Sequence, residues 1–417
     1  MNAEIIAVGS ELLTPDRIDT NSLFLTAALN RLGIEVTRKS VVGDDPSQLR
    51  DAFGGALERS DVIVSSGGLG PTEDDLTRET VAELLDRRLI RDEKILEGIR
   101  ERFRRYKRPM PETNSRQAMV PEGAEILPNP RGTAPGLWLE PRGRIVILLP
   151  GPPGELEPMF EREVIPRLAK RSPGLRLYTR ELRIAGLPES DVEERVSGID
   201  RQYPDVRITI LAVSTEIQLH PRLWSDDERE ANRVLAEMSE RFALALGENL
   251  FSTRGQTLEE VVAESLQRQT ATIAVAESCT GGMLAARLTN VPGSSTYFLG
   301  GIVCYSNEMK ASMVDVPQET IEKYGAVSSE VALALADGVR RRTDATIGVG
   351  ITGIAGPAGG TAEKPVGLVH VAISDRAGSR DKPFQFAGDR QRIRLNATQA
   401  ALDSVRRYLL YATPGKE

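Results

Sequence analysis

Short apolar runs alternate with helix-like segments through the first 66 residues. The runs cover residues 5–8, 34–42 and 61–65, and the helix-like segments cover residues 21–32 and a stretch that begins at residue 45. Asp45 and Pro46 are typical of an N-cap followed by a first helical residue. Strands that alternate with helices favour a parallel sheet with helices on both faces. We therefore predict an α/β class, with a doubly wound N-terminal domain.

Length and composition limit the possible functions. A chain of 417 residues is long enough for two or three domains with sizeable cores. The net charge of −7 argues against a general nucleic-acid binder, which needs a basic face. Cys279 and Cys304 are the only cysteines, too few for a disulfide framework. With no basic leader and no apolar stretch of about 18 residues, we expect a cytoplasmic protein without a membrane partner.

Residues 272–282 join an apolar strand-like run to a helix-like segment. Ser278, Cys279 and Thr280 lie at the junction, and two glycines follow them. Unpaired backbone N–H groups at such a junction suit a phosphate or a developing oxyanion. The structural alternative is a Ser/Thr N-cap with glycines for close packing.

In two later stretches a strand-like apolar run again leads into a turn of polar residues and glycines. Residues 300–310 lead from a strand into a polar turn that carries Lys310, and residues 345–357 end in glycine-bearing polar residues. Only nine of the 53 Lys and Arg residues are lysines. Lysine can lose its proton near neutral pH when it is desolvated, whereas arginine cannot. We expect these turns to meet at the carboxyl edge of one parallel sheet.

A third glycine-rich turn, residues 66–75, also carries acidic residues. Its glycines would cradle a phosphate, and Glu73, Asp74 and Asp75 would suit a hard divalent cation. The alternative is a glycine turn whose acids cap the next helix.

Six motifs in order resemble the C-terminal domain of the CinA family, which implies deamidation of nicotinamide mononucleotide (NMN). The motifs are Ala276–Gly282, Tyr305–Asn307 with Lys310, Gly325–Ser328, Gly353–Pro357, Glu363–Gly367 and Gly388–Arg390. The resemblance implies an α/β/α C-terminal domain over residues 253–417.

Residues 1–170 resemble the MoaB/Mog-like, molybdopterin-binding fold of CinA proteins. The loops 129–136 and 149–156 contribute to this likeness. Leu69 stands where Mog-type proteins have Thr, which weakens molybdopterin chemistry and agrees with the CinA branch. That branch implies ADP-ribose pyrophosphatase activity.

Residues 171–252 form a smaller α+β region that resembles the KH-like middle domain of CinA proteins. It has no Gly-x-x-Gly turn and little basic character, so we expect a connector or dimerisation module, not an RNA binder.

For deamidation we assign Ser278 as nucleophile, Lys310 as its base and Tyr305 as a proton relay or orienting group. Cys279 is the competing nucleophile. His220 and His370, the only histidines, are expected to be structural, so a Ser/His/Asp triad has no support. The oxyanion and substrate phosphate are assigned to Thr280, Gly281, Gly282, Thr352, Gly353, Gly356 and Arg390. We expect no cofactor for this reaction.

For ADP-ribose hydrolysis we assign a phosphate-binding set and a metal set. The phosphate-binding set is Gly68, Gly70, Thr72, Asn129 and Gly132. The metal set, for Mg²⁺ or a transition metal, is Asp44, Asp75 and Asp74, with Glu155 as a further candidate. The resemblance also implies a homodimer. The alternative for this half is a non-catalytic nucleotide- or pterin-binding module with a regulatory role in DNA uptake or damage.

Overall fold

The computed structural model describes residues 1–172 and 174–411. The described chain divides into two compact units, one made of residues 1–178 with 224–231 and the other of the remaining residues. Within the described residues, no helix is long and apolar enough to cross a membrane.

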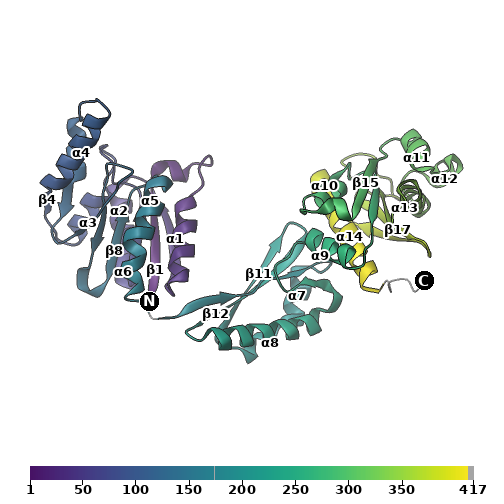
Figure 1. Ribbon diagram of the computed structural model, residues 1–417, viewed down its shortest axis with the longest axis horizontal. Coiled ribbons are helices and arrows are strands. Elements are labelled where there is room, and N and C mark those ends of the chain that lie inside the picture. Colours follow the sequence, from purple (N-terminus) through teal and green to yellow (C-terminus); the bar gives the residue numbers. More distant parts are fainter. Residues whose placement is uncertain (173, 412–417) are drawn as a thin grey trace. The chain divides into compact units, whose positions relative to one another are not determined.

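The first unit is built on a six-stranded sheet in the order β2-β1-β3-β8-β7-β6 (Figure 1). Four strands are parallel: β1 (Asn2–Val8), β2 (Glu35–Val42), β3 (Val62–Ser66) and β8 (Ile145–Leu149). Two antiparallel strands complete one edge: β7 (Gly136–Leu139) and β6 (Glu125–Leu127). A separate ribbon pairs β4 (Leu89–Arg91) with β5 (Met119–Pro121).

Helices cover both faces of this sheet, as the alternation of strands and helices predicts. One hydrophobic core lies under α1 and α5, and the other lies under α2 and α3 (Figure 1). The helices are α1 (Thr20–Arg31), α2 (Pro46–Arg59), α3 (Thr77–Leu84), α4 (Glu93–Arg105), α5 (Pro153–Met159) and α6 (Ile165–Ala169). Asp45 caps α2 by accepting hydrogen bonds from the N–H groups of Ser47 and Gln48, both at 3.0 Å.

The middle region is an α+β fold, as expected. An antiparallel sheet in the order β11-β12-β10-β13 is accompanied by two helices. Its elements are β9 (Arg176–Thr179), β10 (Leu182–Ile184), α7 (Glu189–Val196), β11 (Val206–Val213), β12 (Glu216–Ser225), α8 (Glu228–Leu246) and β13 (Leu250–Ser252). Residues 176–184 thus contain two short strands, β9 and β10.

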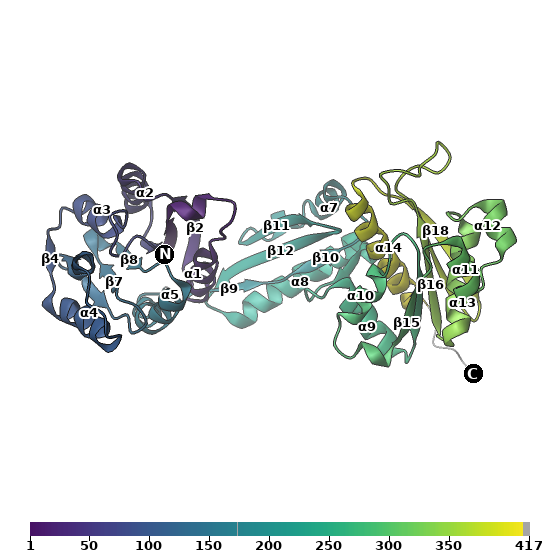
Figure 2. The same cartoon turned by 90° about the horizontal axis from the view of Figure 1, so that it is seen from above.

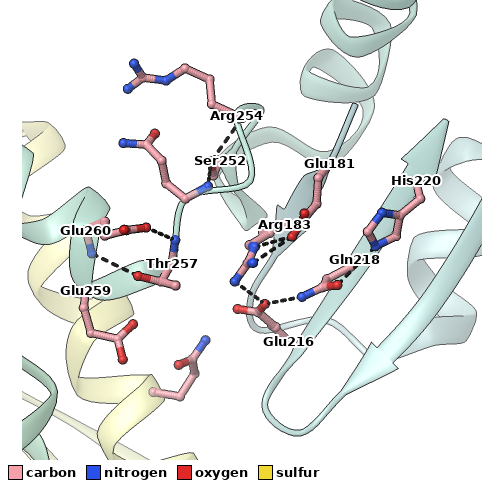
Figure 3. Close-up of polar contacts among 12 residues, drawn as sticks. Glu181, Arg183, Glu216, Gln218, His220, Ser252, Arg254, Thr257, Glu259 and Glu260 are labelled. Atoms are coloured by element: carbon pink, nitrogen blue, oxygen red, sulfur yellow. Dashed lines mark hydrogen bonds and ion pairs between the residues drawn. The ribbon is translucent and has the colours of Figure 1, made fainter. Parts of the chain in front are cut away.

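A polar network crosses the strands of this middle sheet (Figure 3). Arg183 donates to Glu181 at 2.7 Å and to Glu216 at 3.1 Å, and Gln218 also donates to Glu216, at 2.8 Å. His220 lies 3.1 Å from the Gln218 side-chain oxygen, at the end of this chain of contacts. The histidine is therefore part of a cross-strand network on β12.

The C-terminal region has a five-stranded sheet in the order β15-β14-β16-β17-β18 (Figure 2). Its parallel strands are β14 (Ile273–Glu277), β15 (Phe298–Val303) and β16 (Ile347–Gly353). Its antiparallel strands are β17 (Leu368–Asp375) and β18 (Gly378–Gln385).

Helices again cover both faces of this sheet (Figure 2). One face packs against α9 (Leu258–Arg268), α10 (Met283–Thr289) and α14 (Arg390–Tyr411). The other packs against α11 (Asn307–Val314), α12 (Gln318–Tyr324) and α13 (Ser329–Thr343). The class is therefore α/β/α, as predicted.

Close packing of β16 on α13 depends on Gly350. A Cβ at this position would lie 2.3 Å from the Ala332 carbonyl oxygen and 2.6 Å from the Ala336 nitrogen. We expect Gly350→Ala to destabilise the protein by about 1–3 kcal/mol, because neither backbone atom can move without shifting the helix. The urea midpoint of unfolding measures this loss.

Gly300→Ala on β15 is the matched control. No heavy atom of a described residue lies within 4 Å of a Cβ built there. The free energy of unfolding of this variant should therefore differ from that of the wild type by less than about 0.5 kcal/mol, with little change in the urea midpoint. Equal midpoints for the two variants would contradict the packing argument.

Candidate functional site

The three C-terminal turns begin side by side at the carboxyl edge of the sheet. Glu277 pairs with Val303 on one side and with Ile351 on the other. The Ser278 N–H donates to the Ile351 carbonyl at 3.0 Å, and the Cys304 N–H donates to the Glu277 carbonyl at 2.8 Å. The segments that follow β14, β15 and β16 therefore share one edge, as the parallel-sheet argument predicts.

Glu277, which the sequence analysis did not assign, holds the first turn in place. Its buried carboxylate accepts hydrogen bonds from the N–H groups of Gly282 at 3.0 Å, Leu284 at 3.1 Å and Ala285 at 2.8 Å. These are the free N–H groups that begin α10. The available signal was an acidic residue at the end of an apolar run, directly before a glycine turn.

This arrangement corrects the expected oxyanion donors. The Gly282 N–H is bonded to Glu277, and the Gly281 N–H donates to the Ser278 carbonyl at 3.1 Å. Both glycines have positive φ, 61° and 93°, so their role here is conformational. Within the described residues, the N–H groups of Cys279 and Thr280 donate to no backbone carbonyl, and the Cys279 N–H interacts with its own thiol, so these two groups replace the glycine N–H groups as candidate donors.

Lys310 is buried on α11, with 1% of its surface exposed. Its Nζ donates to the carbonyl oxygens of Cys304 at 3.0 Å and Tyr305 at 3.1 Å. Burial lowers the pKa of this ammonium. Its charge also acts on the Cys279 thiol beside Ser278. Across the described residues, no hydrogen bond joins Lys310 Nζ to Ser278 Oγ, although both lie at the same strand ends.

Cys279 and Cys304 are free, buried thiols. Burial raises the pKa of Cys279 to about 12 and that of Cys304 to about 11. Cys279 belongs to the hydrophobic core under α14. Because the thiolate is the reactive form, this environment disfavours Cys279 as a nucleophile.

Arg390 connects the second and third turns. Its Nη1 donates to the Gly356 carbonyl at 2.8 Å, and its Nη2 donates to the Tyr305 hydroxyl at 3.0 Å. Tyr305 therefore directs its backbone carbonyl toward Lys310 and its phenol toward Arg390. The Thr352 hydroxyl, by contrast, is buried and donates to the Ala326 carbonyl at 2.7 Å.

Close packing at Gly353 and a backbone contact of Arg394 give these two residues of the same edge structural roles. Gly353 has no room for a side chain, because a Cβ would lie 2.7 Å from the Leu368 carbonyl oxygen. Arg394, one helical turn after Arg390, was not assigned from the sequence, and its Nη2 donates to the Thr280 carbonyl at 2.7 Å. Arg394 thus holds the Ser278 turn against α14.

The first unit contains a separate cavity of 360 Å³ beside the glycine-rich turn. It brings together most of the residues assigned to ADP-ribose chemistry. Those that line it are Gly68, Gly70, Thr72, Asp44, Asp74, Asp75 and Glu155. Glu11 also lines the cavity, and none of its lining residues is Lys or Arg.

Several of these carboxylates already have protein donors. Asp75 accepts hydrogen bonds from the Thr72 N–H at 2.9 Å and from the Thr72 hydroxyl. Asp44 accepts from the Ser10 N–H at 2.7 Å. A hydrogen bond from Thr72 lowers the pKa of Asp74. In the described chain, no three His, Cys, Asp or Glu residues are grouped closely enough to hold a metal by themselves.

Asn129 and Gly132 do not line this cavity. Asn129 Nδ2 donates to Glu155 at 2.7 Å and to the Ala134 carbonyl at 2.8 Å, and its Oδ1 accepts from the Gly132 N–H at 2.8 Å. A Cβ at Gly132 would lie 1.8 Å from Glu155 Oε2. The structure therefore gives both residues a part in shaping the loop beside Glu155.

Comparison with protein families gives three successive matches. The probable molybdopterin binding domain matches residues 4–170, the damage-inducible protein CinA KH domain matches residues 179–252, and the CinA C-terminal domain matches residues 255–409. The fold and sites thus define a class of protein in which a KH-type domain links a molybdopterin-binding-type domain to a CinA C-terminal domain.

The full chain also resembles curated proteins. A CinA-like protein of Solibacter usitatus is 50% identical over 407 residues, which cover 98% of each chain. A putative competence-damage inducible protein of Acetivibrio thermocellus is 46% identical over 413 residues, covering 98% of this chain and 99% of that one. The chain belongs to the CinA family. This membership suggests an amidase-type enzyme.

Among solved structures, the Thermoplasma acidophilum protein CinA, described as of unknown function, is 40% identical. The match covers 38% of this chain and 94% of that chain, with a TM-score of 0.36.

The raised thiol pKa values predict slow reaction of the folded protein with thiol reagents. At pH 8 both cysteines should be protonated, because their thiolates form only as the pH approaches 11 to 12. We expect almost no reaction with Ellman's reagent in the folded state, and two thiols per chain after unfolding in urea. A thiol that reacts within seconds in the folded protein at pH 8 would contradict this environment.

Proposed function

We propose that the C-terminal domain deamidates NMN to nicotinate mononucleotide and ammonia, and that the N-terminal domain hydrolyses ADP-ribose to AMP and ribose 5-phosphate. The observation that carries the first assignment is the placement of Lys310. Its Nζ is held by the carbonyl of Cys304, whose N–H binds the residue directly before Ser278. The buried amine and the Ser278 hydroxyl are thus carried by neighbouring turns at one sheet edge.

Ser278 is the proposed nucleophile and Lys310 is its base. The Ser278 oxygen attacks the carboxamide carbon, and its proton passes to neutral Lys310. The carbonyl electrons move onto oxygen, where the N–H groups of Cys279 and Thr280 would stabilise the charge. Lys310 then returns the proton to the leaving nitrogen, the C–N bond breaks, and ammonia departs. Water cleaves the resulting ester to give the acid and free Ser278.

The absence of a Ser278–Lys310 hydrogen bond in the free protein is compatible with this scheme. Catalytic contacts often tighten only when substrate is bound. Lys310 has three donor hydrogens when charged and two carbonyl acceptors in this structure. The neutral amine would direct its lone pair toward Ser278 after losing one proton.

Arg390 is the proposed ligand of the substrate phosphate. Two of its five N–H groups hold Gly356 and Tyr305, which leaves others for a phosphate oxygen. In this proposal Tyr305 orients both Lys310, through its carbonyl, and Arg390, through its hydroxyl. Thr352, Gly353 and Gly356 would shape the wall behind the sugar phosphate.

Four variants test the nucleophile and the base. Ser278→Ala should lower kcat by roughly 10³-fold or more, whereas Cys279→Ala should keep most of it. Lys310→Arg should be nearly as damaging as Lys310→Ala, because guanidinium cannot accept a proton at neutral pH. Ammonia release under steady-state conditions measures each kcat. In the wild type, kcat should rise with pH through the lowered pKa of Lys310, because the neutral amine is the base.

Thermal unfolding of each variant is the control for folding, because Lys310 is buried. Substantial kcat in Ser278→Ala would instead favour Cys279 or a directly activated water as the nucleophile. Near-wild-type kcat with a raised KM in Lys310→Arg would instead make Lys310 a substrate-binding residue.

The N-terminal proposal is supported by the charge of the 360 Å³ cavity. Its lining residues include several carboxylates and no basic side chain, so a pyrophosphate would be repelled unless a cation accompanied it. Mg²⁺ usually binds one or two carboxylates and completes its shell with phosphate oxygens and water. Asp44 and Asp74 would supply such oxygens, and the ion would supply charge neutralisation to the phosphates.

The residues of the turn would then act on the pyrophosphate directly. The backbone at Gly68 and Gly70 and the Thr72 hydroxyl would position its oxygens. Glu155 would accept a proton from the attacking water, while the P–O–P bridge breaks and its oxygen leaves with one phosphate. Asp75 holds the turn through Thr72 and has the more structural part.

Chelation should separate the two activities. We expect EDTA to abolish ADP-ribose cleavage and to leave NMN deamidation unchanged, because the proposed deamidation uses Ser278, the Lys310 amine and backbone N–H groups, whereas the proposed cleavage needs a cation beside the carboxylates of the N-terminal cavity. Both reactions would be followed on the same preparation, with Mg²⁺ added back to restore cleavage. Equal loss of both activities would contradict this division. No cleavage with any divalent metal would favour a nucleotide- or pterin-binding module.

A further inference from the structure

A second cavity, of 810 Å³, lies in the C-terminal unit. Its walls come from β17, β18 and α14, with the middle-domain residues Ala185 and Asn249 at one side. No residue assigned to the amidase chemistry lines it. Its volume falls in the range of small-molecule sites, about 300–1,000 Å³. The cavity therefore has the size of a ligand site and no role in the proposed reactions.

Strand register decides which side chains of β18 face this cavity. Lys382 pairs with Val371 and Arg380 pairs with Ile373, and cross-strand partners project to the same face of a sheet. Val371 and Ile373 belong to the core under α14. Asp381, between the two cations, also lines the cavity, but its carboxylate projects to the opposite face, where it lies 2.8 Å from His370 Nδ1.

Two aromatic residues lie beside these cations, Phe384 on β18 and Phe386 directly after the end of that strand. The rings of Phe384 and Phe386 are stacked, with centroids 5.6 Å apart and planes 9° apart. Both rings are only partly buried, and both line the cavity. Lys382 Nζ lies 5.1 Å from the Phe384 ring, and Arg380 lies 4.6 Å from the Tyr408 ring. Flat apolar surface thus lies directly beside positive charge.

Asp381 and Asp403 are the acidic residues that line the cavity, and within the described residues neither forms an ion pair with Arg380 or Lys382. Asp403 accepts hydrogen bonds from Arg406 at 2.6 Å and from Arg407 at 2.7 Å. Arg380 is 3.5 Å from Asp375, and Lys382 has no ion pair within the described residues. The β18 side of the cavity is therefore suited to an anion.

A buried amide adds a directed donor. Arg287 donates to Gln399 Oε1 at 2.6 Å, and because guanidinium can only donate, this contact fixes the orientation of the amide. Among the described residues, Gln399 Nε2 has no hydrogen-bond partner; this atom is buried, and Gln399 is 5% exposed and lines the cavity. An unpaired buried donor is unfavourable and would be satisfied by an acceptor atom.

We propose that this cavity binds a purine nucleotide. The base would lie against the Phe384–Phe386 pair, a ring acceptor would take the Gln399 Nε2 hydrogen, and the phosphate would meet Lys382 and Arg380. A nucleotide combines in one small molecule the flat ring, the acceptor and the negative charge that these walls select.

Photolabelling of the full chain with 8-azido-AMP tests the proposal. We expect labelling that unlabelled AMP competes away and that maps to peptides within residues 380–411. Lys382→Ala should weaken labelling by about tenfold, since it removes a charge-assisted contact. Lys323→Ala is the matched control, because Lys323 also lies over an aromatic ring, 4.9 Å from Tyr324, and does not line the cavity. It should label like the wild type.

Gln399→Glu supplies a second, conservative variant. It keeps an acceptor toward Arg287 and replaces the free donor by an acceptor, so labelling should fall while the thermal unfolding midpoint stays near that of the wild type. The proposal is wrong if labelling maps only to the N-terminal cavity. It is also wrong if AMP does not compete, or if Lys382→Ala and Lys323→Ala label equally.

Discussion

The carboxylate of Glu277 is the contact on which the C-terminal site depends. A buried, unpaired carboxylate would strongly oppose folding, and three N–H groups at the start of α10 satisfy this one. Hydrogen bonds to a charged group contribute about 1.5–3 kcal/mol each. The same residue ends β14, and its carbonyl binds the Cys304 N–H. One residue therefore joins a strand, a helix and the neighbouring turn, and Ser278 follows it directly.

The partners of Lys310 determine what this buried cation can do. A carboxylate beside it would stabilise the ammonium and raise its pKa. Lys310 instead meets two neutral carbonyls, which satisfy its donors and leave burial as the main influence on its pKa. Arg390 donates a hydrogen bond to the Tyr305 hydroxyl. The residue whose carbonyl binds Lys310 is therefore fixed in turn by Arg390. The Lys310 amine is therefore buried, held by two hydrogen bonds, and has a pKa lowered by burial.

Local patterns in the sequence predicted the architecture and the meeting of the three turns. Alternating strands and helices predicted the parallel part of the N-terminal sheet, and the capping pair Asp45-Pro46 marked the start of α2 correctly. The antiparallel edges were not predicted, because pairing of β6 with β7 and of β17 with β18 depends on contacts that no periodicity records. Glu277 was missed for the same reason, since its capping role depends on how the glycine turn folds back.

The two candidate sites differ in the charge of the side chains around them. The N-terminal cavity is lined by carboxylates without a basic residue, so an anionic substrate would need a cation as its partner. At the C-terminal edge, Arg390 and Arg394 already bind the turns and Lys310 lies buried among carbonyls. Here the positive charge belongs to side chains of the protein itself. The chemistry that each domain can support therefore depends on whether the protein's own side chains or an added cation must supply the positive charge.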